Sequence, residues 1–505
     1  MAVPRVLLVV IDGCTPRILG PALARGELPC LAALAAAGSL DLECTSIFPS
    51  ITPAATASIV TGRHPADHGI AGMSWLNPEE GDVSYFGDDV ATVLQRGPAD
   101  FLSRFLIELN GDRLRAPTIM QTAERHGIAA GSFNYLIFRG DVSYEATPPS
   151  WLRLWPFMPH TLSICGPSVF RLGEFVGSPD RRLLRHRGIR HRFGLDDAAT
   201  EDFLVAFSGA EALPPFSIAY FADYDFEAHD RGPVEALDVL HALDRRLQHI
   251  LDAWGGLERV LRHTAIVVTA DHCHSEVGQH AEAGIALEQL LGELRLGDPA
   301  SGWKESDHAI VCPNMRAAQI HVRGRDEALT RRIVELLLRD RRNDQVIWRE
   351  GDGDEAAWYQ VITADRGAMR FSVGNGAGAV RDAHGTAWQC QGDLAAVDAD
   401  VTTGEIRFGA YPNAFERIAG GLSHLRGGHL WVTARPGFEF AAAGQRPHKG
   451  AGSHGALHES DSLVPLLVAG AASPAPPRPA RIVDVEPLCR QILGLPPPAT
   501  PGTRR

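Results

Sequence analysis

Continuous apolar runs alternate with amphipathic stretches over much of the chain. Three of these runs have strand length: VLLVVID at 6–12, PFSIAYFAD at 215–223 and TAIVVTAD at 264–271. Such runs are typical of strands that a parallel sheet buries on both faces. Stretches with helical periodicity, bounded by Pro and Gly, predict helices over 29–38, from Pro53 to Gly62, up to His126–Gly127, over about 234–254 and over 483–494. This order predicts an α/β fold: a doubly wound, mostly parallel sheet flanked by helices.

Shorter elements and a change of pattern complete this plan. Short strands are expected near 40–44 and at 128–134, and the Pro/Arg-rich stretch around 148–200 is expected to form loops and surface helices. From about 295 the apolar residues alternate in runs such as AAQIHV and WYQVI, with a helix around 325–340, which predicts an α+β insertion or cap. The run SLVPLLVAG then predicts a last core strand. We therefore expect a core formed by 1–294 and completed by 426–495, an insertion at 295–425 and a tail at 496–505.

Composition narrows the class of protein. The 505 residues include 48 Lys+Arg and 61 Asp+Glu, a net charge of −13, with 45% hydrophobic residues, as in ordinary globular proteins. An acidic chain without a Lys/Arg run is not expected to bind a nucleic acid polymer or an anionic membrane. No apolar run approaches the ~20 residues of a membrane helix, and no signal peptide is recognised. Eight cysteines without a CxxC pair are expected to be reduced core residues of a cytoplasmic protein.

Aspartate and histidine residues, both common metal ligands, lie next to the predicted core strands. Asp12 ends the first run, Asp223 and Asp225 follow SIAYFA, and the pair Asp271–His272 follows AIVVTA. His454, in GSHG, precedes the last core strand. The carboxyl ends of parallel strands meet in one crevice, so carboxylates and imidazoles far apart in sequence are expected to share a metal site there.

The segment YFADYDFEAHDRGP adds spacing to this prediction. Asp225 and His229 are four residues apart, which places both side chains on the same face of a helical turn, as two ligands of one cation require. Asp223 and Glu227 are nearby acidic residues at the wrong spacing.

Thr52 is the candidate nucleophile. It precedes Pro53, the expected first residue of a helix, so its hydroxyl lies at a helix N-terminus, where free N–H groups favour an alkoxide and a bound phosphate. Thr52 alone would be interpreted as an N-cap. The metal ligands expected beside it favour the catalytic role.

These residues resemble the alkaline phosphatase superfamily, and within it the type I phosphodiesterase/nucleotide pyrophosphatase branch. The matching pieces are VIDG, FPSITPAATASIVTGRHPADHGI, DYDFEAHDRGP, TADH and GSHG followed by VPLLVAG. The resemblance implies an alkaline phosphatase-like core with two divalent metal ions, normally zinc, with manganese or iron as alternatives. One ion would be bound by Asp12, Thr52, Asp271 and His272, and the other by Asp225, His229 and His454.

The resemblance also implies a reaction. Thr52 would attack the phosphorus of a small phosphate ester, and water would then hydrolyse the phosphothreonine, so two in-line displacements would give net retention at phosphorus. The expected activity is hydrolysis of nucleotide-like phosphodiesters. Phosphomonoesterase or phosphonate hydrolase activity is the alternative, and a non-catalytic metal-binding relative is an alternative of another class.

Two departures from the branch bear on these alternatives. Met73 stands where the nucleotide pyrophosphatases have an Asn that contacts the phosphate, and the nearest Asn is Asn77. Cys273 replaces the Gly that usually follows the Asp–His pair. His274 and His280 are therefore additional candidates, expected to be outer or surface residues. His448 and His458 flank His454, but only His454 lies in the SHG context. A sulfatase is not expected, because SITPAA lacks the CxPxR-like context for formylglycine. A haloacid-dehalogenase-type phosphatase would need Asp where Cys14 stands.

Overall fold

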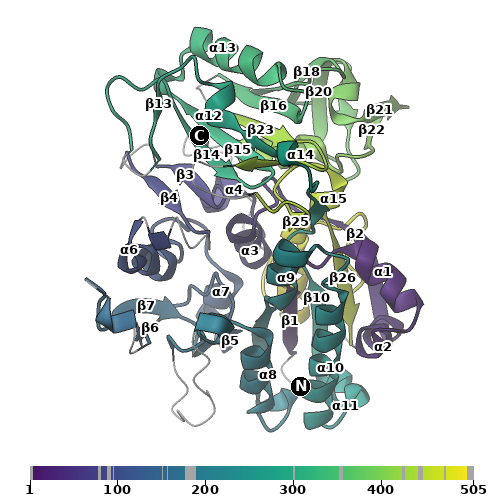
Figure 1. Ribbon diagram of the computed structural model, residues 1–505. Coiled ribbons are helices and arrows are strands. Elements are labelled where there is room, and N and C mark those ends of the chain that lie inside the picture. Colours follow the sequence, from purple (N-terminus) through teal and green to yellow (C-terminus); the bar gives the residue numbers. More distant parts are fainter. Residues whose placement is uncertain are drawn as a thin grey trace.

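A seven-stranded sheet forms the larger part of the molecule (Figure 1). The computed structural model describes residues 4–497 except 78–80, 88–92, 95, 150–151, 156, 177–188, 300–301, 352–356, 423–426, 442–446 and 471–473. The strand order is β2-β26-β10-β1-β9-β5-β8. The strands are β1 (Val6–Ile11), β2 (Gly38–Thr45), β5 (Ala130–Phe133), β8 (Val169–Arg171), β9 (Phe216–Phe221), β10 (Ala265–Thr269) and β26 (Leu463–Ala469).

Most neighbours in this sheet are parallel. β1 pairs in parallel with β9 and β10, β5 pairs in parallel with β8 and β9, and only β26 runs antiparallel, to both β10 and β2. Every residue of β1 is buried, as a strand with helices on both faces requires. The predicted doubly wound, mostly parallel α/β fold is confirmed.

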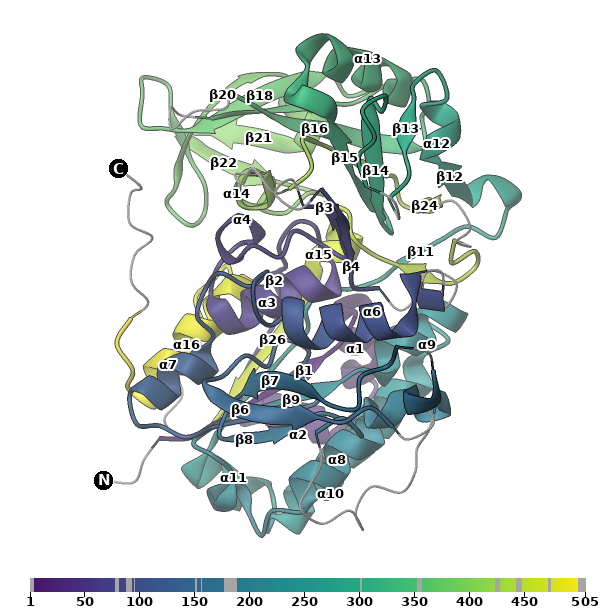
Figure 2. The same ribbon diagram turned by 90° about the vertical axis from the view of Figure 1, so that its left-hand side faces the viewer.

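Helices cover both faces of this sheet (Figure 2). Leu7 and Val9 of β1 face Leu247 of α10, while the alternate residues of β1 face the opposite side. The helices on the first side are α2 (Pro29–Ala36), α8 (Asp197–Val205) and α10 (Leu237–Ala253). Those on the second side are α3 (Thr52–Thr61), α7 (Ile119–Arg125) and α16 (Val485–Leu493). Five of the six lie, to within one residue, inside segments where the sequence pattern predicts helices, and α8 begins at the end of the stretch expected to carry surface helices and continues to Val205.

A second, mixed sheet of eleven strands stands above the first (Figures 1 and 2). Its order is β13-β14-β15-β23-β16-β17-β18-β20-β19-β22-β21, and α13 (Glu327–Leu338) packs against β16. The strands are β13 (Leu296–Gly297), β14 (Ala309–Asn314), β15 (Ala317–Val322), β16 (Asn343–Glu350), β17 (Trp358–Ile362), β18 (Ala368–Val373), β19 (Val380–Arg381), β20 (Ala387–Gly392), β21 (Ala399–Thr402), β22 (Glu405–Phe408) and β23 (Leu430–Ala434). β23 lies after residue 426 in sequence but pairs with β15 and β16 inside this sheet. The proposed division at 295 and 426 stays a prediction.

The stretch around 148–200 differs from the expected loops and surface helices. β7 (Leu162–Gly166) pairs with β6 (Val142–Ala146), and β8 forms the edge of the main sheet. These strands are short, and β8 has only three residues, so they carry too few positions for an alternating pattern to stand out from the surrounding Pro and Arg residues.

Small elements connect the two sheets and surround the ends of the central strands. They are α4 (Pro65–His68), α6 (Pro98–Ser103), α9 (Asp223–Arg231), α11 (Leu257–His263), α12 (Leu287–Leu290), α14 (Ala414–Leu422), α15 (Glu459–Ser462), β3 (Ser74–Leu76), β4 (Val83–Tyr85), β11 (Ser275–Glu276), β12 (Gly284–Ala286), β24 (Glu439–Ala441) and β25 (Gly452–Ser453). The hairpin β3–β4 packs its first strand against β14 and β15 of the upper sheet.

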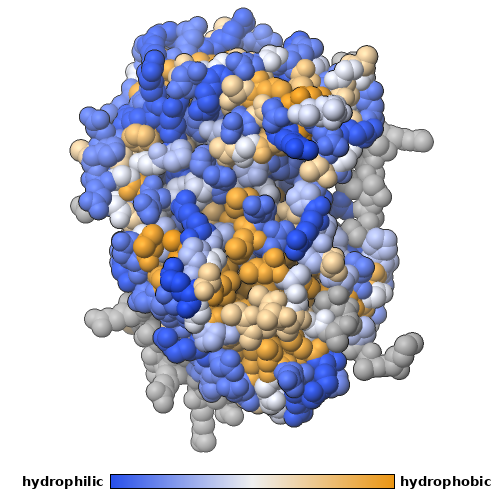
Figure 3. Space-filling view, turned by 90° about the vertical axis from the view of Figure 1, so that its right-hand side faces the viewer, coloured by the Kyte–Doolittle hydropathy of each residue, from blue (hydrophilic) through white to orange (hydrophobic). Residues whose placement is uncertain are grey.

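Apolar side chains gather on the outer face that carries α2 and its neighbour α1 (Pro16–Ala24), as the space-filling view shows (Figure 3). Within the described part of the chain, no single helix has the length and hydrophobicity needed to span a bilayer. α1 and α2 meet those criteria only as a pair, with a bend of 88° between them.

Candidate metal centre

The carboxylates of Asp12 and Asp271 meet at the ends of β1 and β10. Gly13, at φ +64°, turns the chain after Asp12, and its N–H donates to Asp271 Oδ1 at 3.2 Å. The Tyr220 hydroxyl donates to Asp12 Oδ2. The other two oxygens, Asp12 Oδ1 and Asp271 Oδ2, are buried and have no hydrogen-bond partner within the described chain. Two buried carboxylate oxygens without donors indicate that the site is built for a cation.

His272 faces both of these oxygens. Its Nε2 lies 3.4 Å from Asp12 Oδ1 and 3.5 Å from Asp271 Oδ2. The side chain is fully buried. These three residues form one of the groups whose ligand atoms lie within 4.8 Å of one another.

Thr52 completes this first group. α3 begins at Thr52 itself, one residue before the expected start at Pro53, and Thr52 Oγ1 lies 2.9 Å from His272 Nε2. Nearby Ser50 is turned elsewhere, because its hydroxyl donates to Ala456 O at 3.0 Å. Thr52 is therefore the hydroxyl of this loop that faces the ligand atoms.

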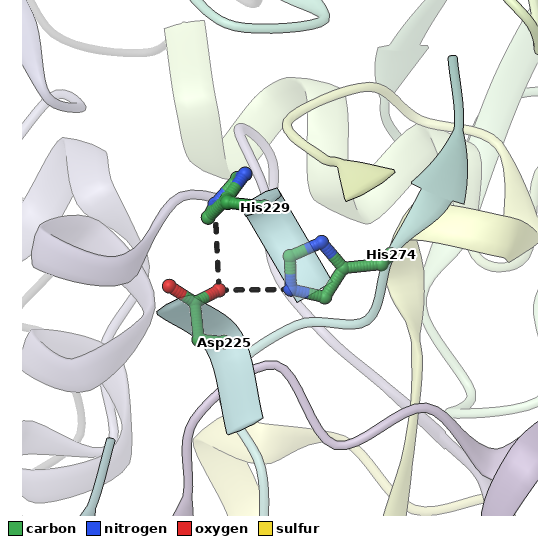
Figure 4. Close-up of side chains that lie close together, drawn as sticks. All are labelled: Asp225, His229 and His274. Carbon is green, nitrogen blue, oxygen red and sulfur yellow. Dashed lines mark hydrogen bonds and ion pairs between the residues drawn. The ribbon is translucent and has the colours of Figure 1, made fainter. Parts of the chain in front are cut away.

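The second group is built on α9. Asp225 and His229 lie one turn apart, with 3.5 Å between Asp225 Oδ1 and His229 Nε2 (Figure 4). His454, after β25, places its Nε2 3.1 Å from His229 Nε2 and 3.9 Å from Asp225 Oδ1. A backbone carbonyl orients each imidazole through its Nδ1: His229 Nδ1 lies 2.9 Å from Gly452 O, and His454 Nδ1 lies 2.8 Å from Ser50 O. Donation to these carbonyls leaves each Nε2 with a lone pair for a metal ion.

The two groups adjoin. Asp225 Oδ1 lies 3.8 Å from His272 Nε2, and the rings of His272 and His454 stack with centroids 3.5 Å apart and planes inclined by 11°. The structure thus brings together all seven residues that the sequence suggested.

Burial sets the protonation of this cluster. Burial, reinforced by the neighbouring carboxylates, raises the pKa of Asp12, and burial also raises the pKa of Asp225 and Asp271. A bound cation would offset this cost by stabilising the ionised carboxylates. Burial lowers the pKa of His229 to about 3 and the pKa of His272 well below its ordinary value, so both imidazoles are neutral at pH 7, the form that binds metals.

Other polar candidates lie outside the cluster or at its edge, with one exception. Asp223 pairs with Arg192, Glu227 pairs with Arg231 at 2.7 Å, His458 caps α15, and His280 packs on Phe438. His448 lies at the edge of the cluster, since its ring centroid is 4.4 Å from that of His229, and its Nδ1 lies 2.8 Å from Glu439 Oε1. The exception is His274, expected to be an outer or surface residue, which is fully buried with Nε2 2.9 Å from Asp225 Oδ1 (Figure 4). The only sequence signal for the position of His274 in the cluster is that it follows the predicted ligand His272 by two residues.

Met73 lies in a small apolar cluster with Ile51 and Tyr85. Ile51 directly precedes Thr52 in the sequence. Its backbone N–H donates to Asn314 Oδ1 at 2.7 Å. Asn77 is held in the β3–β4 hairpin, where its N–H donates to Asp82 O at 2.7 Å. Met73 therefore places a buried thioether, packed with Ile51 and Tyr85, at the sequence position where the resemblance to the nucleotide pyrophosphatases implies an amide.

Solved structures with the same fold include enzymes of two kinds. Murine ectonucleotide pyrophosphatase/phosphodiesterase 5 is 14% identical, with a TM-score of 0.57, and the match covers 98% of this chain and 96% of that one. The human enzyme is 15% identical, with a TM-score of 0.56 and the same coverage. Phosphonoacetate hydrolase from Sinorhizobium meliloti 1021, solved in complex with phosphonoformate, is 19% identical, with a TM-score of 0.56 and 98% coverage of both chains.

No curated protein sequence matches the chain. The sequence profile of the family described as type I phosphodiesterase/nucleotide pyrophosphatase matches residues 6–457, which include every residue of the cluster. The predicted resemblance is confirmed, and with it the class of enzyme, a phosphoric ester hydrolase. The chain belongs to the type I phosphodiesterase/nucleotide pyrophosphatase family.

Proposed function

We propose that the protein hydrolyses nucleotide-like phosphodiesters on a two-zinc site, with Thr52 as covalent nucleophile. The observation that carries this proposal is the position of Thr52 Oγ1, 2.9 Å from His272 Nε2 beside a buried cluster of carboxylates and imidazoles. Within the described residues, Thr52 is the hydroxyl-bearing side chain with a hydrogen bond to that cluster's imidazoles.

The donor set fits two ions. Asp12, Thr52, Asp271 and His272 would hold one, and Asp225, His229 and His454 the other. Mixed nitrogen and oxygen donors suit zinc, with manganese or iron as alternatives. When bound, the ions would act as Lewis acids that stabilise negative charge on the phosphoryl oxygens.

The residues of this chain define the steps. Thr52 Oγ1 loses its proton to solvent and forms a bond to phosphorus, while the bond from phosphorus to the leaving oxygen breaks on the opposite side and that oxygen takes a proton from water. Water then attacks the phosphothreonine in line, which releases the phosphate monoester and restores the hydroxyl. Because α3 begins at Thr52, the free N–H groups of its first turn add positive potential where the phosphoryl group would lie.

The apolar cluster of Met73, Ile51 and Tyr85 favours a second candidate, hydrolysis of a phosphonate or monoester. The fold is shared with an inactive variant of murine ectonucleotide pyrophosphatase/phosphodiesterase 5 solved in complex with AMP and with phosphonoacetate hydrolase. A screen of p-nitrophenyl phenylphosphonate, p-nitrophenyl thymidine monophosphate, p-nitrophenyl phosphate and p-nitrophenyl sulfate separates these activities. Preference for the monoester would contradict the diester proposal.

Thr52→Ala tests the nucleophile. Activity on the preferred ester should fall by several orders of magnitude, because no neighbouring hydroxyl replaces Oγ1, while the other ligands keep most of the metal. Thr52→Ser should retain much of the rate. The matched control is Thr61→Ala at the far end of α3, whose hydroxyl donates to Ala57 O at 2.7 Å. Near wild-type hydrolysis by Thr52→Ala would refute the covalent route.

We also propose a cytoplasmic location. All eight cysteines are free, as expected in a compartment that keeps thiols reduced. Detection of the native protein outside the cytoplasm, by cell fractionation, would contradict this proposal.

A further inference from the structure

His274 stands two residues after His272, where the chain leaves β10, and its imidazole lies in the cluster (Figure 4). Its Nε2 is 2.9 Å from Asp225 Oδ1, the same oxygen that faces His229. Its Nδ1 is buried and has no hydrogen-bond partner among the described residues. The ring therefore presents Nε2 to the oxygen around which the second ligand group is built.

Two glycines make room for this ring. At Gly13 a Cβ would lie 2.5 Å from His274 Nε2, and at Gly452 a Cβ would lie 2.8 Å from His274 Nδ1. Real Cβ atoms essentially never come within 3.0 Å of a non-bonded heavy atom, so a side chain at Gly13 would crowd this ring and Asp225 Oδ1, and one at Gly452 would crowd the ring and Ala228 O. The backbone at Gly13, after β1, and at Gly452, in β25, thus forms a cradle that fits His274.

The imidazoles around Asp225 are spaced like ligands of one ion. With zinc–nitrogen distances of about 2.0–2.1 Å and tetrahedral angles, the ring centres of two imidazoles on one ion lie about 5 Å apart. The ring centroids of His229 and His454 are 5.0 Å apart, and His274 is 4.7 Å from the first and 5.3 Å from the second. His272, by contrast, stacks on His454 at 3.5 Å, a spacing that suits rings on neighbouring ions.

We propose that His274 is a fourth protein ligand of the ion that Asp225, His229 and His454 hold. This inference rests on the two-metal site proposed above and extends it. Four protein ligands close a tetrahedral site, whereas three leave a position open. The ion beside His274 is therefore retained more firmly than three ligands would allow, and a substrate oxygen joins it only as a fifth ligand.

Metal affinity distinguishes a ligand from a hydrogen-bond donor. In His274→Gln the amide keeps an N–H that can donate to Asp225 but loses the imidazole. We expect the Co²⁺-loaded variant to lose more than about 100-fold in affinity for one ion in competition with a chelator, beyond the 10–100-fold cost of losing an outer partner. The matched control His280→Gln, outside the cluster, should bind both ions as wild type does. Wild-type affinity in His274→Gln would overturn the inference.

A second measurement needs no variant. In the NMR spectrum of the wild-type protein loaded with Co²⁺, each imidazole bound to cobalt contributes one strongly shifted N–H signal. We expect four, from His229, His272, His274 and His454, and three would overturn the inference. Two bound ions with only three signals would refute the role of His274 alone, whereas fewer than two bound ions would refute the two-metal site itself.

Discussion

Arg417 of α14 links the upper sheet to the loops that carry the candidate metal centre. Its guanidinium is buried and donates to Ser462 Oγ at 2.5 Å, to Leu457 O at 2.8 Å, to Ile47 O at 3.1 Å and to Pro412 O at 3.2 Å. Ile47 precedes the Thr52 loop and Leu457 follows His454. Burial lowers the pKa of Arg417 to about 9, so the side chain stays charged at pH 7. Arg417→Met should therefore destabilise both the junction and the site.

The magnitude follows from these contacts. Hydrogen bonds to a charged group contribute about 1.5–3 kcal/mol each, and four are lost. Methionine carries no charge, so the variant no longer has the desolvation cost of a buried guanidinium, and this stabilises the folded state by several kcal/mol. We expect a net loss of about 2–4 kcal/mol in the free energy of unfolding.

Urea denaturation followed by tryptophan fluorescence measures this loss as a lower transition midpoint. The matched control is Arg407→Met on the exposed face of β22, where the arginine side chain is 72% exposed and its nearest carboxylate is 4.0 Å away. The control should change stability by less than about 0.5 kcal/mol. Equal midpoints for the two variants would show that the buried contacts of Arg417 do not hold the junction together.

Asp225→Ala and His229→Ala should each empty one metal position and leave the other partly filled in metal analysis, whereas Asp223→Ala, whose carboxylate is engaged outside the cluster, should keep both ions. Equal metal content in all three variants would contradict the assignment of the pair. Iodoacetamide should modify exposed Cys165 in the native protein, but should spare Cys14 until denaturant is added, because burial raises the pKa of that thiol to about 12. Equal labelling rates for the two thiols would contradict the described burial.

The sequence pattern predicts much of the fold and the candidate site for a physical reason. Strands buried on both faces are continuous apolar runs, and the residues that follow them, such as Asp12 and Asp271, must meet where parallel strands end. Helical spacing in turn brings Asp225 and His229 together on α9.

What sequence reasoning missed depends on contacts between distant segments. His274 enters the cluster because Gly13 and Gly452 leave room for its ring, and no local pattern encodes that space. The antiparallel direction of β26 is not visible in its apolar run, since such a run has no direction. The residues of β23 do not show which sheet the strand joins, because that depends on its partners β15 and β16, which lie far away in sequence.

The stereochemical course at phosphorus tests the central claim most directly. A diester made chiral at phosphorus with sulfur and oxygen isotopes would be hydrolysed in isotopically labelled water, and the configuration of the product determined by ³¹P NMR. A phosphothreonine at Thr52 requires two in-line displacements, so the account predicts net retention of configuration. Net inversion would mean a single displacement by water, and would contradict the role of Thr52 as covalent nucleophile.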